Sequence, residues 1–161
     1  MTSQTQVPTS CRTLARFRVR GLARSFARDA HGVELSPATK VVFRNPVPVL
    51  FEHDCALEIG RSLLFRCHRG WEFHGHITLD PDDRLHAEVL QLIQAGKIRF
   101  LSIGHTPGHG DVRRKKPCIW NESEIVEVSI SARPGADRFA LISEIVQLED
   151  TKNDNASNAR T

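Results

Sequence analysis

The sequence lacks the features that would place it in a membrane or in the secretory pathway. None of its apolar runs approaches the roughly 20 residues that a membrane-spanning helix needs. The polar start, Met1 to Gln6, has no apolar core of a signal peptide, and neither an internal repeat nor a long linker is visible. We therefore expect one cytosolic domain whose cysteines are reduced thiols, namely Cys11, Cys55, Cys67 and Cys118.

The common metal-binding motifs are missing as well. The sequence contains no Cys-x-x-Cys and no His-Glu-x-x-His, although it holds eight histidines and four cysteines. Short-spaced candidates for ligands do exist: Cys67 with His68, His74 with His76, and His105 and His109 with Cys118. A metal-binding protein is therefore one alternative function. A cysteine nucleophile, Cys55 beside His53, is another.

The charge pattern gives no clear nucleic-acid signature. The net charge is +3, and no aromatic residues are interleaved with the basic clusters to form a stacking surface. We interpret the basic residues as solvated charges on edge strands and loops, and expect neither a membrane nor a specific nucleic-acid partner. The clusters are Arg113 to Lys116 and the early arginines, Arg12, Arg16, Arg18, Arg20 and Arg24.

Most of the chain has the pattern of β-strands. Residues 16–20 alternate polar and apolar side chains, the period of a half-buried strand. Between residues 57–65 and 71–79, Arg69-Gly70 predicts the turn of a hairpin. Further strands are expected at 40–43, 47–51, 98–103, 119–120, 123–132 and 138–147. We predict one domain over residues 13–148, with disordered segments at 1–12 and 149–161.

One helix is well signalled, at about residues 81–95. Asp80 is expected as its N-cap and Pro81 as its first residue, while Gly96 is suited to the position after its end. Leu85, Val89, Leu92 and Ile93 form an apolar stripe on one face. The predicted fold class is mainly β with α (α+β), a small twisted barrel-like domain with this one helix.

Three separate segments carry residues suited to nucleophilic catalysis. His53 follows an apolar strand, Ser102 lies within Leu101-Ser102-Ile103-Gly104, and Glu127 lies within Glu127-Val128-Ser129. A serine hydroxyl becomes a good nucleophile only when a base takes its proton and a third group orients that base. Each residue also has an ordinary interpretation: a turn histidine, a strand serine bonded to backbone, a solvent-facing carboxylate. Local sequence alone does not choose between them.

Taken together and in this order, the motifs resemble those of the prohead (capsid maturation) serine proteases of tailed bacteriophages. The resemblance extends from about Arg16 to Ile142. The matching motifs are His53-Asp54, Ile59-Gly60, Leu101-Ser102-Ile103-Gly104, Glu127-Val128-Ser129 and the segment Arg133-Pro134-Gly135-Ala136-Asp137. The resemblance implies a fold like that of the prohead and herpesvirus assemblin-type proteases. It also implies that His53 is the general base, Ser102 the nucleophile and Glu127 the orienting acid.

The resemblance also implies a biological setting. The substrate would be the scaffolding segment of the major capsid protein, cleaved inside the assembling prohead in the host cytoplasm. Self-cleavage, an oligomeric or capsid-associated state and independence of any cofactor are implied too. An inactive assembly or scaffolding factor of the same fold is the alternative.

Two departures from the family pattern affect the site. His105 stands where an aromatic residue is typical, and Pro134-Gly135 replaces a Pro-Ala pair. Because His105 places a second imidazole near Ser102, the choice of base stays open at this stage.

Overall fold

The computed structural model describes residues 13–107 and 118–149. The predictions made for residues 1–12, for the basic cluster 113–116 and for the tail beyond 149 lie outside the described residues. The elements, in chain order, are β1 (Ala15–Ser25), β2 (Val33–Glu34), β3 (Lys40–Val42), β4 (Val47–Phe51), β5 (Asp54–Cys67), β6 (Gly70–Leu79), α1 (Arg84–Gln94), β7 (Phe100–Pro107), β8 (Cys118–Ile119), β9 (Glu122–Ser131) and β10 (Ile142–Leu148).

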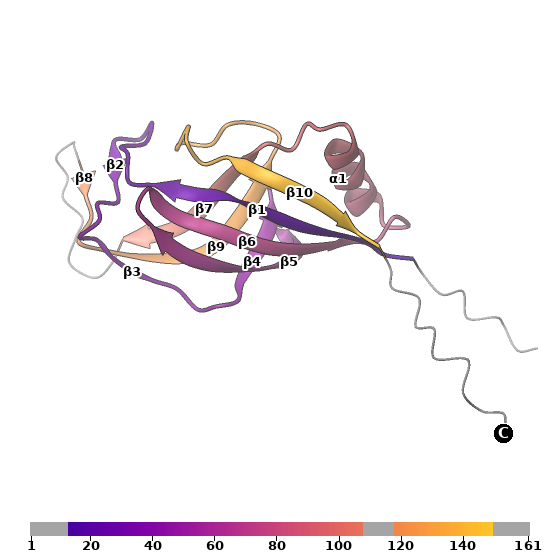
Figure 1. Ribbon diagram of the computed structural model, residues 1–161, viewed down its shortest axis with the longest axis horizontal. Coiled ribbons are helices and arrows are strands. Elements are labelled where there is room, and N and C mark those ends of the chain that lie inside the picture. The colour runs from indigo at the N-terminus through magenta and orange to yellow at the C-terminus, as the bar shows by residue number, and fades with distance from the viewer. Residues whose placement is uncertain (1–12, 108–117, 150–161) are drawn as a thin grey trace, which may run out of the picture.

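All the described strands except β2 and β8, which pair with each other, form one strongly curved sheet that closes on itself. Its hydrogen-bonded order is β10-β1-β6-β5-β4-β9-β3, and β7 pairs with β9 (Figure 1). The segment before β10 joins the two ends, because Leu101 N–H donates to Ala140 O and Leu22 N–H donates to Leu141 O. Closing a sheet in this way removes exposed edges and encloses a core. The predicted class, mainly β with one helix among the described residues, is confirmed.

The long hairpin β5–β6 follows the sequence prediction closely. On β6, Trp71, Phe73 and Ile77 face the core while Glu72 and His76 face outward, as their alternation predicts. The core that the barrel encloses is almost wholly aliphatic and aromatic. Its fully buried members include Val19, Leu35, Val49, Phe73, Leu79, Val89, Leu101, Val128 and Ile130.

Helix α1 starts later than predicted. Asp83, not Asp80, is the N-cap: its carboxylate accepts the N–H groups of Leu85 and His86. The hydrogen bond from His86 N–H is the main cause of the lowered pKa of Asp83. Residues 80–83 form a turn instead, closed by a bond from Asp83 N–H to Asp80 O.

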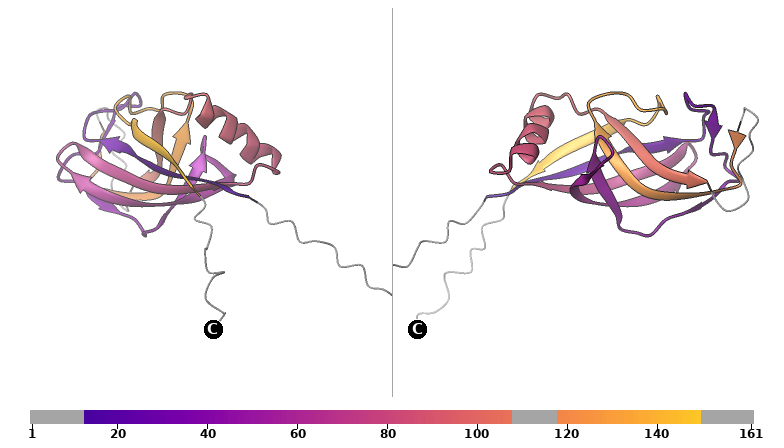
Figure 2. Two further views of the ribbon diagram at one scale, coloured as in Figure 1. Left: turned by 45° about the vertical axis from the view of Figure 1, so that its right-hand side comes forward. Right: turned by 180° about the vertical axis from the view of Figure 1, so that it is seen from behind.

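The end of α1 is as its pattern suggests, whereas its apolar stripe is only partly buried: Leu92 and Ile93 pack against the core with Val89, but Leu85 is 48% exposed. Gly96 has a φ of 64°, the left-handed conformation that ends a helix and favours glycine. Val89 is fully buried, and α1 lies beside the end of the sheet where β6 ends and β7 begins (Figure 2). Within the described residues, no helix has the length and apolar character needed to cross a bilayer.

The C-terminal strand is shorter than predicted. Residues 138–141 are not strand, and β10 begins at Ile142, because this segment bridges β1 and β7 rather than pairing with one neighbour. In the same region β1 runs between β10 and β6, so it is not an edge strand.

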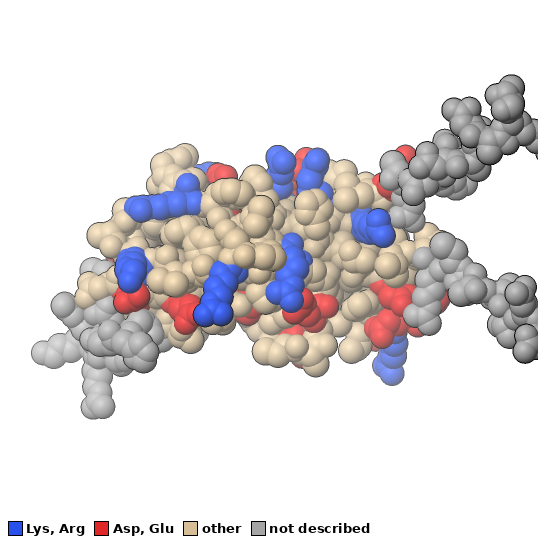
Figure 3. Space-filling model, turned by 90° about the horizontal axis from the view of Figure 1, so that it is seen from below, with Lys and Arg blue, Asp and Glu red and all other residues tan. Residues whose placement is uncertain are grey.

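The arginines of β1 therefore differ from the prediction of solvated edge charges. Arg18 and Arg20 are partly exposed and lie near Glu144, whereas Arg24 is only 2% exposed. On the face shown in Figure 3, basic side chains are spread among uncharged ones, and most of the acidic side chains lie along its lower side.

Candidate active site

A tight turn between β4 and β5 presents His53. Phe51 pairs with Asp54, so the turn consists of Glu52 and His53 alone, with φ angles of 51° and 63°. Two consecutive left-handed residues are the requirement of a type I′ turn, which usually recruits glycine or asparagine. For Glu and His this conformation costs about 1 kcal/mol or more per residue, and it persists only where neighbours hold it.

Strand β9 holds this turn in place. Glu52 N–H donates to Ile130 O (3.2 Å), and the Glu52 carboxylate accepts from Ser131 Oγ (2.9 Å) and Ala132 N–H (3.1 Å). Its other oxygen lies 3.7 Å from the Arg133 guanidinium. The residue just before His53 thus ties the turn to the chain that leaves β9.

The three residues predicted from the motifs come together across β4, β7 and β9. His53 Nε2 lies 2.8 Å from Ser102 Oγ, and His53 Nδ1 lies 2.6 Å from Glu127 Oε1. With Nδ1–H donated to the carboxylate, Nε2 is left to accept the proton of the Ser102 hydroxyl. The Glu127 side chain is 11% exposed and that of His53 48%, so the acid is shielded while the imidazole meets solvent.

Gly104 makes room for the carboxylate. It pairs with Glu127 across β7 and β9, and a Cβ atom on Gly104 would overlap Glu127 Oε1. A register shift follows directly, between Gly104 and His105, where Val126 bulges out of β9. The space that Gly104 leaves open is therefore filled by the Glu127 side chain.

The loop after β9 covers Ser102. A Cβ atom on Gly135 would lie 3.2 Å from Ser102 Oγ, closer than most side-chain contacts. This loop is anchored through Asp137, whose carboxylate accepts from Ser25 N–H (2.6 Å), Ser25 Oγ (3.0 Å) and Phe139 N–H (3.0 Å). Its conformation next to the serine is thus fixed from β1.

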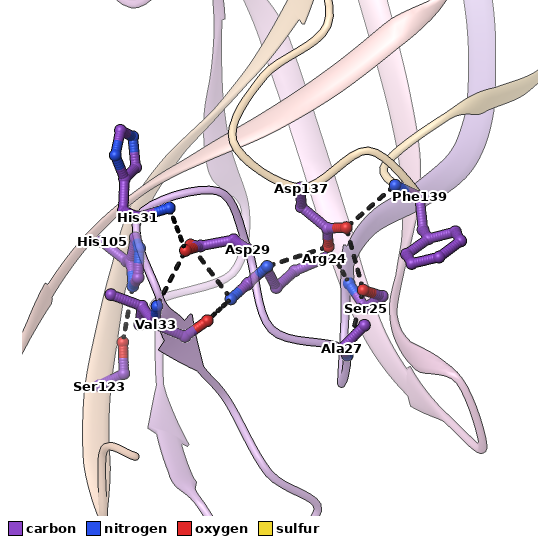
Figure 4. Close-up of polar contacts among 10 residues, drawn as sticks. All are labelled: Arg24, Ser25, Ala27, Asp29, His31, Val33, His105, Ser123, Asp137 and Phe139. Carbon is purple, nitrogen blue, oxygen red and sulfur yellow. Dashed lines mark hydrogen bonds and ion pairs between the residues drawn. The ribbon is translucent and has the colours of Figure 1, made fainter. Parts of the chain in front are cut away.

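A buried ion cluster lies beside this loop (Figure 4). Arg24 Nη1 is 3.1 Å from Asp137 Oδ2, and Arg24 Nη2 is 3.3 Å from Asp29 Oδ2 and donates to Val33 O. The three charged side chains are 7% exposed or less. Sequence reasoning missed the cluster because its members are 5 and 113 residues apart in the chain and form no local motif.

A small cavity of about 30 Å³ separates the ion cluster from Ser102. It has room for roughly one water molecule. Besides the three charged residues it is lined by Ser102, Ala23, Ile103, His105 and Ala136.

His105, the second imidazole near Ser102, has a different partner. Its Nδ1 lies 3.3 Å from Ser123 Oγ, and its ring packs on Trp120 with centroids 4.6 Å apart. Burial and, next, the positive charge of Arg24 lower the pKa of His105 to about 4, against a smaller opposing effect of Asp29. Near neutral pH the ring is uncharged, and the imidazole that contacts Ser102 Oγ is that of His53.

The alternative ligand and nucleophile residues are only partly within the described part of the chain. Among those residues, no three His, Cys, Asp or Glu side chains are grouped so that they could hold a metal ion. His109 and the Cys118 side chain lie outside it. Cys55 is an exposed free thiol and Cys67 a partly exposed one.

The chain is similar to one protein family and to several solved structures. The family model of the caudovirus prohead serine proteases matches residues 30–154. Among solved structures, the protease of Kaposi's sarcoma-associated herpesvirus bound to a hexapeptide phosphonate inhibitor is similar, with 17% identity and a TM-score of 0.49 over 84% of this chain and 66% of that one. No curated protein matches.

Two further herpesvirus structures are similar to this chain. Another structure of the Kaposi's sarcoma-associated herpesvirus protease has 19% identity and a TM-score of 0.46, over 84% of this chain and 62% of that one. The varicella-zoster virus protease has 13% identity and a TM-score of 0.37, over 70% of this chain and 63% of that one. The chain thus spans just under two thirds of the length of the protein in each of these three structures.

Proposed function

The chain belongs to the caudovirus prohead serine protease family, and from this premise we propose that it is a serine endopeptidase of phage capsid maturation. Its proposed substrate is the scaffolding segment of the major capsid protein, cleaved inside the assembling prohead in the host cytoplasm. Cleavage of its own chain is part of the proposal.

The proposed mechanism is acyl transfer by Ser102, His53 and Glu127. Ser102 Oγ attacks the peptide carbonyl carbon while His53 Nε2 takes the hydroxyl proton. The tetrahedral intermediate collapses, the C–N bond breaks, and His53 returns the proton to the leaving amine. Water then attacks the acyl-enzyme ester in the same way, which releases the acid and restores Ser102. No cofactor takes part.

One observation carries the proposal: a continuous hydrogen-bonded path from hydroxyl to imidazole to carboxylate. Its two links, of 2.8 Å and 2.6 Å, join side chains that lie up to 74 residues apart in the sequence. The short link to Glu127 is suited to a charge-assisted hydrogen bond, which would stabilise the imidazolium formed during attack. The Glu127 carboxylate fills the space that Gly104 leaves open, and the His53 side chain is 48% exposed.

Co-expression with the major capsid protein tests the proposal. Wild type, Ser102→Ala and the control Ser62→Ala are compared by the intact masses of both chains. Ser62 is a strand serine too, but it is buried and its hydroxyl donates to Val47 O, away from the site. We expect trimmed capsid protein and trimmed protease with wild type and Ser62→Ala, and intact chains with Ser102→Ala.

The other outcomes point to different functions. Intact masses with all three proteins, in properly assembled particles, would favour the scaffolding factor. Trimming that persists in Ser102→Ala would assign the chemistry to another nucleophile or to a metal.

A further inference from the structure

We infer that Ser129 is a positioning residue whose hydroxyl fixes the position of His53 relative to Glu127. The catalytic consequence of this inference rests on the proposed function, whereas the structural link does not. Ser129 lies on β9, two residues beyond Glu127 and opposite Ser102 on β7, and it is fully buried.

The Ser129 hydroxyl makes two hydrogen bonds within the site. It donates to Glu127 Oε2 (2.8 Å) and accepts from the backbone N–H of His53 (3.0 Å). A hydroxyl has one proton and two lone pairs, so both bonds form at once. Their directions are also fixed, because a backbone N–H only donates and a carboxylate only accepts. The serine proton has no competing orientation in this arrangement.

These bonds divide the two oxygens of Glu127 between two partners. Oε1 lies against the His53 imidazole and Oε2 against Ser129, which stops the carboxylate from rotating. The same hydroxyl anchors the His53 backbone, while the carboxylate anchors its ring. His53 is thereby held at both ends, in a turn whose left-handed φ of 63° needs external support.

No other contact of the described residues replaces this link. Glu52 anchors the preceding residue of the turn through hydrogen bonds with Ile130, Ser131 and Ala132, and none of these bonds involves Glu127 or the imidazole. Removing the Ser129 hydroxyl leaves Oε2 without this donor and the His53 N–H without this acceptor. A hydrogen bond to a charged group contributes enough to predict about a ten- to hundredfold slower reaction at Ser102.

The first test is the rate at which a fluorophosphonate ester labels Ser102, followed by intact mass. Such a probe needs an activated serine but no knowledge of the cleavage site. The variants are Ser129→Ala, Ser129→Thr, which keeps a hydroxyl and suits a strand, and the control Ser62→Ala. We expect labelling to slow at least tenfold in Ser129→Ala and to stay within threefold of wild type in the other two.

The second test measures the effect of Ser129 on the hydrogen bond between His53 and Glu127 and does not depend on catalysis. In the Ser102→Ala protein, the proton NMR signal of His53 Nδ1–H is identified by ¹⁵N-histidine labelling. Its short bond to Glu127 predicts a far-downfield position. Adding Ser129→Ala should move this signal upfield or broaden it by exchange with water, while adding Ser62→Ala should not. A role confined to overall stability would leave the signal in place.

The outcomes separate the inference from the proposed function. If Ser102 is labelled as fast in Ser129→Ala as in wild type, the inference is overturned. An unmoved His53 signal in the folded Ser129→Ala variant would overturn it as well. Equal slowing in Ser129→Thr and Ser129→Ala would also contradict a role for the hydroxyl. Absence of labelling in wild type would overturn the proposed function, and the NMR signal would then decide the link between Ser129, His53 and Glu127 alone.

Discussion

Gly104 and Glu127 face each other across β7 and β9, and any side chain at position 104 would occupy the place of the Glu127 carboxylate. The glycine is part of the site although it offers no functional group. The space left at Gly104 lets the carboxylate lie beside the His53 imidazole with so little exposure to solvent.

The first prediction concerns this contact. In Gly104→Ala the Cβ atom displaces Glu127 Oε1, so the bond to His53 Nδ1 is lost and the imidazole is no longer oriented. We expect fluorophosphonate labelling of Ser102 to fall by about a hundredfold, comparable to the effect of Glu127→Ala. Combining both substitutions should add little, because they remove the same interaction. Independent, multiplying effects would contradict this explanation.

The second prediction concerns the turn that carries His53. In Glu52→Ala the carboxylate that accepts from Ser131 Oγ and Ala132 N–H is missing, and the left-handed turn loses support. We expect urea unfolding to show a loss of about 1–3 kcal/mol. Glu52→Gln is the matched control, because its amide oxygen can still accept both bonds and only the distant contact with Arg133 is weakened. Equal losses in the two variants would assign the effect to charge instead.

Much of this architecture could be predicted from the sequence, and the failures have physical causes. The β5–β6 hairpin follows from the alternation of polar and apolar residues along its strands. The end of α1 follows from a glycine, which readily adopts the positive φ that ends a helix. The turn at Glu52 and His53 could not be predicted, since neither residue favours it and the supporting bonds come from β9. The start of α1 was misplaced because Asp80 and Asp83 are equally good caps by sequence.

The site divides in the same way. The motifs placed His53, Ser102 and Glu127 in one hypothesis, and the structure brings their side chains together, while their catalytic roles stay a prediction. Ser129 belongs to the motif Glu127-Val128-Ser129, and the alternation of side chains along a strand places Ser129 on the same face as Glu127. Its partner, the His53 N–H, belongs to a turn that no local signal revealed. Arg24 was misjudged because its burial depends on Asp29 and Asp137, which only the folded chain brings together.

The third prediction concerns that ion cluster. In Arg24→Ala two carboxylates remain buried without their shared counter-charge, so we expect a loss of about 3–5 kcal/mol in the free energy of unfolding. Arg28→Ala is the matched control, since Arg28 is half exposed and pairs with Glu34 at the surface. Its effect should stay below about 1 kcal/mol. Similar effects of the two substitutions would show that the Arg24 cluster does not support the fold.

The fourth prediction concerns pH. Burial and the nearby Arg24 lower the pKa of His105 from 6.5 to about 4. Between these values the unfolded chain binds a proton that the folded chain does not, so His105 favours unfolding increasingly as the pH falls from 6.5 towards 4. Urea unfolding at pH 7 and pH 5 should show a larger loss for wild type than for His105→Gln. An equal loss would mean that the ring is not kept neutral by the fold.

The central claim is that Ser102 is made nucleophilic by His53 and Glu127, and the residue modified by a fluorophosphonate tests it most directly. Wild type, His53→Ala and Glu127→Ala are treated alike, digested, and mapped by tandem mass spectrometry. The account predicts phosphonylation at Ser102 in wild type and about a hundredfold or greater loss in both variants. Labelling of a different residue, or of Ser102 at an unchanged rate without His53, would contradict it.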